Sequence, residues 1–114
     1  MYKESIDFNA LTKADKNKCI ARLNGWKERI VGEPSPAFNY AVWDNSPYFG
    51  CDHVPNYVGD LNEMFRLEQT LSKKQSSYFA GVLVNICGSV EEALRADAEE
   101  RAEAYWVTKK RIDQ

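Results

Sequence analysis

The sequence holds few of the residues that cross-link a chain or bind a metal. It has three cysteines and one histidine in 114 residues. Cys19, Cys51 and Cys87 are odd in number and far apart, and none belongs to a paired-thiol motif. Disulfide frameworks and zinc sites need paired or clustered thiols. We therefore expect reduced thiols, no metal and no cofactor.

Long apolar runs and an excess of one charge are also missing. No run approaches the roughly 20 apolar residues of a transmembrane helix, and the N-terminal segment MYKESIDFNAL lacks the apolar core of a secretion signal. These absences predict a cytoplasmic protein with no membrane partner. With 15 basic and 17 acidic residues the net charge is −2. This balance argues against general nucleic-acid binding, because such binding rests on many cations.

Aromatic residues, by contrast, are plentiful, with three Trp, six Tyr and five Phe. The remaining composition, 44% hydrophobic and 28% charged, is typical of a globular protein. We expect a single domain over residues 1–114, with an N-terminal arm of about residues 1–11. The rings need either a well-filled core or a surface that stacks on a ligand.

The front half predicts one helix followed by a hairpin. A capping threonine and a terminal Asn-Gly pair bound a helix over Lys13–Asn24, whose four cations are expected to form a solvated face. Trp26–Val31 and Tyr40–Trp43 have the composition of β-strands and predict an antiparallel pair. Residues 44–56 are irregular, and a long loop in a small domain is often functional.

The back half predicts three helices, each opened by the same capping device. In a capping box, a side-chain oxygen and a Glu or Gln three residues later bind the first free amides of a helix. The three pairs are Asp60/Glu63, Ser72/Gln75 and Ser89/Glu92. The third would open one long helix over Val90–Arg111, with Leu94 in its buried stripe. Along that helix we expect two favourable ion pairs at i,i+4 spacing, Glu91–Arg95 and Asp97–Arg101.

These elements predict an α+β fold. A small antiparallel sheet of two to three strands would pack against about four helices, and the C-terminal half would be helical. A hairpin is marginal by itself and needs helices against one face.

Several pieces of the sequence also resemble a known family. They are Gly25-Trp26 after the first helix, Pro55-Asn56-Tyr57 followed by Asp60–Met64, a helix bearing Tyr78, and the closing run Ala98–Lys110. From about Thr12 onward these packing and capping motifs resemble the phage ABA sandwich domain, a family of small, mostly uncharacterised phage and prophage proteins. Phe65–Leu67 departs from the pattern, so a site built on the His common there is not carried over. The resemblance implies a phage-encoded protein of the bacterial cytoplasm, with no established activity.

A candidate ligand site lies in the front half, where aromatic and charged residues cluster. Its residues are Trp26, Lys27, Arg29, Tyr40, Trp43, Tyr57 and Asp60. Rings interleaved with cations can stack on a base and neutralise phosphates, and the helix that opens at Asp60 offers free amides. The alternative is that these rings fill the core, as aromatic residues commonly do.

The leading hypothesis is a phage-encoded, non-catalytic binding protein that counters host defence by sequestering a small nucleotide-type signalling ligand. A second hypothesis is an inhibitor that binds a host protein directly. A third is a small hydrolase or lyase that uses the Cys51–His53 loop, disfavoured because adjacent side chains usually point apart. A fourth is an oligomeric structural or assembly protein. We expect a homo-oligomer, since small domains rich in aromatic area often bury some of it between subunits.

Overall fold

The computed structural model describes residues 7–32, 39–45 and 53–111. Its elements, in chain order, are the 3-10 helix η1 (Phe8–Ala10), α1 (Lys13–Leu23), β1 (Lys27–Gly32), β2 (Asn39–Asp44), α2 (Leu61–Glu68), α3 (Lys73–Cys87), α4 (Val90–Leu94) and α5 (Ala98–Arg111). The two strands form one antiparallel sheet. The two-stranded sheet and the helical C-terminal half confirm the predicted α+β class.

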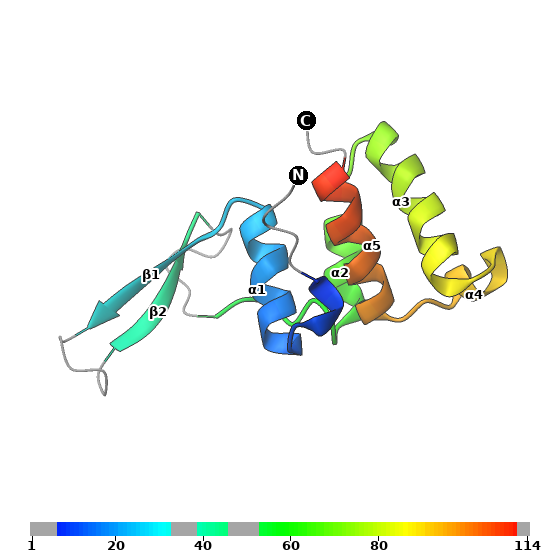
Figure 1. Cartoon of the computed structure of the whole chain (residues 1–114). Helices are drawn as coiled ribbons and strands as arrows, with labels where there is room; N and C mark the ends of the chain where they lie inside the picture. Colours follow the sequence, from blue (N-terminus) through cyan, green and yellow to red (C-terminus); the bar gives the residue numbers. More distant parts are fainter. Residues whose placement is uncertain (1–6, 33–38, 46–52, 112–114) are drawn as a thin grey trace.

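The helices form a bundle from which the hairpin projects (Figure 1). Helix α5 contacts α1, α2, α3 and η1, while α4 packs on the end of α3. The hairpin leaves α1 and extends away from the other helices, and the molecule measures 51 × 34 × 25 Å. Among the described residues no helix is long and apolar enough to cross a bilayer.

Helix α1 contacts the sheet at the base of the hairpin. The rings of Trp26 and Trp43 meet edge to face, with centroids 6.3 Å apart. The guanidinium of Arg22 lies 5.5 Å from the Trp43 ring, and its Nη2 donates to Glu28 Oε1 at 3.0 Å. The sheet therefore packs against the helices at the point where its strands leave the body.

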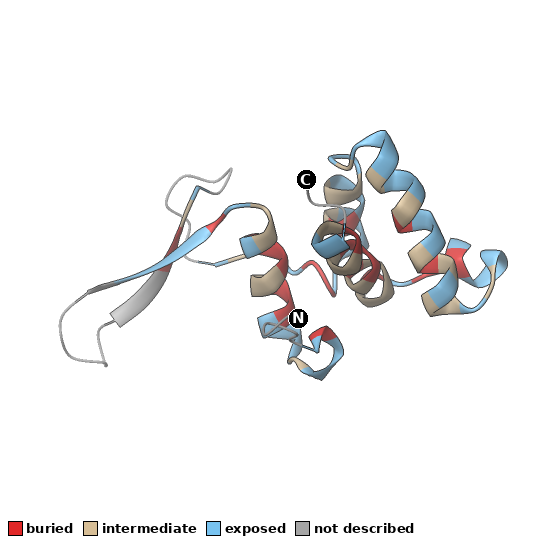
Figure 2. Ribbon diagram, turned by 45° about the horizontal axis from the view of Figure 1, so that its top comes forward, coloured by how far each residue is buried: buried red, intermediate tan, exposed pale blue. Residues whose placement is uncertain are grey.

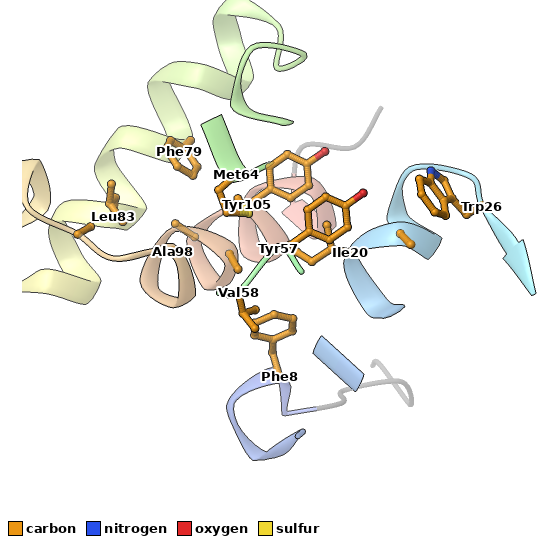
Figure 3. Close-up of a cluster of buried hydrophobic side chains, with 14 of the residues drawn as sticks. Phe8, Ile20, Trp26, Tyr57, Val58, Met64, Phe79, Leu83, Ala98 and Tyr105 are labelled. Atoms are coloured by element: carbon orange, nitrogen blue, oxygen red, sulfur yellow. The ribbon is translucent and has the colours of Figure 1, made fainter. Parts of the chain in front are cut away.

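The core lies where the helices face one another. Figure 2 shows buried residues gathered on these inner faces, with exposed residues on the outside. Ile20, Met64 and Tyr105 have no exposed surface, and Figure 3 shows them converging from α1, α2 and α5. The Tyr105 hydroxyl donates to Asn24 Oδ1 at 3.0 Å, which gives this buried ring a polar partner.

The 3-10 helix η1 is anchored to the bundle through Phe8, whose ring stacks on that of Trp106 with centroids 5.3 Å apart. The expected solvated face of α1 is wrong at one position, because Lys16 is buried. Its ammonium lies 5.5 Å from the Phe8 ring and 2.5 Å from Glu99 Oε2. An aromatic face and a carboxylate thus compensate its burial.

The prediction of one helix over 90–111 is wrong, because the helix is interrupted between α4 and α5. At the break, Asp97 Oδ1 accepts the Glu100 amide at 2.8 Å and Glu100 Oε1 accepts the Asp97 amide at 3.0 Å, a reciprocal capping box. The break turns Leu94 away from the predicted buried stripe and leaves it 77% exposed. Arg101 pairs with Glu68 instead of Asp97. The predicted Glu91–Arg95 helical pair fails too, because Arg95 follows the last residue of α4.

The three predicted capping boxes have different outcomes. The box of Ser72 and Gln75 is fully formed. Ser89 Oγ accepts the amide of its predicted partner at 3.1 Å, which is half of a box. Asp60 accepts the Asn62 amide at 3.0 Å, while Glu63 turns toward Arg66 at 2.9 Å. The residue types placed each helix start correctly even where the reciprocal bond is missing.

Candidate binding surface

Three rings of the predicted ligand site are part of the core. Trp26, Trp43 and Tyr57 are 5%, 2% and 4% exposed. Trp26 and Trp43 fill the base of the hairpin, whereas Tyr57 lies among the residues between α1 and α5 (Figure 3). Their rings are packed against protein, so in this conformation they offer no open face on which a base could stack.

Two cations of the predicted site, Lys27 and Arg29, are exposed on β1. Arg29 donates two hydrogen bonds to Asp44, from Nε to Oδ2 at 2.8 Å and from Nη2 to Oδ1 at 3.1 Å. The hydrogen bond from Arg29 lowers the pKa of Asp44 below its ordinary value. This bidentate pair braces the two strands across the base of the hairpin.

The remaining predicted residues do not join these cations. Asp60 lies at the start of α2 and is occupied as its cap. The segment before α2 is tied to α1, because Asn17 Oδ1 accepts the Val58 amide at 2.9 Å. Tyr40 lies in β2, and its side chain is outside the described part of the chain. The structure thus brings together Trp26, Lys27, Arg29 and Trp43 at the hairpin base and places Tyr57 and Asp60 elsewhere.

The loop proposed for catalysis is described only at its end. Cys51 and Asp52 lie outside the described residues, and His53 is exposed. Across residues 7–32, 39–45 and 53–111, no group of three His, Cys, Asp or Glu side chains could hold a metal ion. Cys19 and Cys87 are free thiols, and burial raises the pKa of Cys87, helped by the carboxylates of Glu100 and Asp97.

An exposed surface of the hairpin lies on β1, where residues 27–30 are exposed. The inner half of the hairpin is charged, whereas the outer strand segments, Ile30–Gly32 and Asn39–Ala41, carry no charge. The register pairs Ile30 with Ala41 and Val31 with Tyr40. Ile30 is 62% exposed and adds an apolar side chain to this uncharged part of the hairpin. This surface was not predicted from the sequence, although two uncharged strand segments facing each other were a visible signal.

The chain matches no protein-family profile, no curated protein and no solved structure. The resemblance to the phage ABA sandwich domain therefore stays a prediction.

Proposed function

We propose that this is a non-catalytic binding protein that docks on another protein through its hairpin, β1–β2. The observation that carries the proposal is a projecting ribbon with an uncharged outer half and an exposed Ile30. A two-stranded hairpin standing in water is marginally stable. A partner that covers the ribbon, or adds a strand to one of its edges, would bury apolar surface and pair backbone groups.

The base of the hairpin supports this role because it is braced. The Arg22–Glu28 pair joins the ribbon to α1, and the Trp26–Trp43 contact and the two hydrogen bonds from Arg29 to Asp44 hold the base of the ribbon together. An arm held in one orientation loses less conformational entropy on binding than a free loop does.

The resemblance to phage proteins suggests where the partner belongs. In a phage-encoded protein, the partner would be a component of host defence, and the protein would act as a direct inhibitor. Sequestration of a nucleotide ligand stays a prediction. The burial of Trp26, Trp43 and Tyr57 is the reason we place protein docking ahead of it.

The test is quantitative affinity purification from bacterial lysate with the wild type and two variants. Ile30→Asp puts a carboxylate on the hairpin, and Ala80→Asp puts one on the exposed surface of α3 as the matched control. Burying an isoleucine is worth about 1.5–3 kcal/mol, so loss of this contact should weaken capture about tenfold or more. Thermal unfolding followed by circular dichroism confirms that both variants fold.

We expect a protein retained by the wild type and by Ala80→Asp but lost from Ile30→Asp. Equal retention by all three would refute docking through the hairpin. Native mass spectrometry of the same samples separates the alternative, because an intact nucleotide bound to all three would support ligand sequestration.

A further inference from the structure

A second exposed apolar surface lies at the far end of the bundle, on α4. Val90 and Leu94 are 63% and 77% exposed, and their i,i+4 spacing puts them on one side of the helix. Glu91 is exposed beside this pair and Glu92 is exposed on the other side of the short helix, while Ala93 is buried against the bundle. We call Val90, Glu91, Glu92 and Leu94 the α4 ridge. It is an apolar contact surface flanked by two carboxylates, with the exposed Arg95 just after Leu94.

The opposite end of the bundle carries the complementary charge. Helices α3 and α5 pack side by side and run antiparallel (Figure 1). The carboxylates of Glu100 and Asp97 are close enough to the Cys87 thiol to raise its pKa. The start of α5 therefore lies beside the end of α3. The start of α3 and the end of α5 therefore share the other end. We call this the basic end; its residues are Leu71, Lys73, Lys74, Lys109, Lys110 and Arg111.

The basic end combines cations with apolar surface. Lys73 and Lys74 are exposed in the first turn of α3, which contains no acidic residue. The positive end of the α3 dipole adds to their field. Leu71, just before them, is half-buried, and Lys110 lies 5.8 Å from the ring of the half-buried Trp106.

Charge decides how two copies would meet. Two α4 ridges placed face to face through Val90 and Leu94 would bring Glu91 of each copy together, and such like-charge contact is unfavourable. The ridge of one copy against the basic end of the next brings acid to base and covers Val90 and Leu94. We infer that the protein self-associates head to tail, with the α4 ridge docked on the basic end of a second copy.

This arrangement has consequences for assembly. A head-to-tail contact uses two different surfaces, so it forms a closed ring or an open chain and not an isologous dimer. Attraction between exposed charges is screened at high salt, so association should weaken as salt rises. The contact is separate from the hairpin, so this inference does not depend on the proposed function.

The test is sedimentation velocity over a wide concentration range, with a charge-swap pair of variants. Lys73→Glu/Lys74→Glu makes the basic end acidic, and Glu91→Lys/Glu92→Lys makes the ridge basic. We expect the wild type to associate. Each variant by itself should associate at least about tenfold more weakly than the wild type. An equimolar mixture of the two should associate again, because each then meets a complementary partner.

Leu94→Ser should weaken association with no change of charge, and Ile30→Asp should leave it intact. Circular dichroism confirms that each variant folds. A wild type that stays monomeric over the whole concentration range would overturn the inference. The α4 ridge would then be a surface for a basic partner other than a second copy. Association that persists in Leu94→Ser, or a mixture of the swapped variants that stays monomeric, would also overturn it. Loss of capture by Ile30→Asp with intact self-association would separate the two proposals.

Discussion

Replacing Arg101 with methionine should lower the free energy of unfolding, because it removes one member of a buried ion pair. Arg101 Nη1 donates to Glu68 Oε1 at 2.8 Å, and the two side chains are only 15% and 14% exposed. Two further atoms of the pair, Glu68 Oε2 and Arg101 Nε, are buried and have no hydrogen-bond partner among the residues that the structure describes. The guanidinium also lies 5.0 Å from the Phe65 ring. Burial raises the pKa of Glu68 above 4.5, outweighing the attraction of Arg101.

Removing one member of a buried pair typically costs about 3–5 kcal/mol, because a charge stays buried without compensation. We expect the lower end, about 3 kcal/mol for Arg101→Met, since both side chains keep some contact with water. For a domain of this size that lowers Tm by about 12 °C. The double variant Glu68→Leu/Arg101→Met removes both charges and should be as stable as the wild type or more so.

The assay is urea unfolding followed by circular dichroism, with Arg66→Met as the matched control. Arg66 pairs with Glu63 at 2.9 Å but is 67% exposed, so its loss should cost less than about 1 kcal/mol. Equal losses for Arg66→Met and Arg101→Met would refute the reasoning. So would a double variant that is less stable than Arg101→Met.

The pH dependence gives this prediction a second readout. Without Arg101 the pKa of Glu68 in the folded state should rise further above its ordinary value of 4.5, which applies in the unfolded state. At a pH between these two pKa values, the folded state binds a proton on Glu68 and the unfolded state does not. The stability gained from that proton is fully present below the unfolded pKa and is lost as pH rises through the folded pKa. The deficit of Arg101→Met should therefore shrink as pH falls from neutrality toward 4.5. A constant deficit would contradict a buried carboxylate as its cause.

Two further substitutions test how the helices are joined. Asn17→Ala should cost about 1–3 kcal/mol in urea unfolding, because the buried Val58 amide loses its acceptor; unchanged hydrogen exchange at that amide would contradict this role. Gly88→Ala should cost about 1–2 kcal/mol from backbone strain, since Gly88 ends α3 at φ 99° and no atom of the described part of the chain lies within 4 Å of an added Cβ. Gly81→Ala, inside α3 with equal space, should instead stabilise by up to about 1 kcal/mol, and the same sign for both would refute the explanation.

Local signals explain how much of the fold the sequence predicts. Helix starts at Thr12, Asp60, Ser72 and Ser89 depend on residues three or fewer positions away, and all four are caps in the structure. The break at Asp97 had the same kind of signal, an Asp followed three residues later by Glu. It was missed because the apolar stripe runs through the break with helical spacing.

The candidate site was harder to predict because burial depends on distant residues. Arg101 meets Glu68 across 33 positions of sequence and Lys16 meets Glu99 across 83. Nothing near Trp43 in the sequence shows that Arg22 and Trp26 cover its ring. A cluster of rings beside cations is therefore compatible with a ligand site and with a core, and tertiary packing places these rings in the core.

The most direct test of the account is a photo-crosslink from the hairpin in living bacteria. A benzophenone side chain would replace Ile30 in one variant and Ala80, exposed on α3, in the other. Docking through β1–β2 predicts a discrete adduct with another protein from position 30 and none from position 80. The account would be contradicted by no adduct at position 30, by equal adducts at both positions, or by an adduct at position 30 with the mass of a second copy.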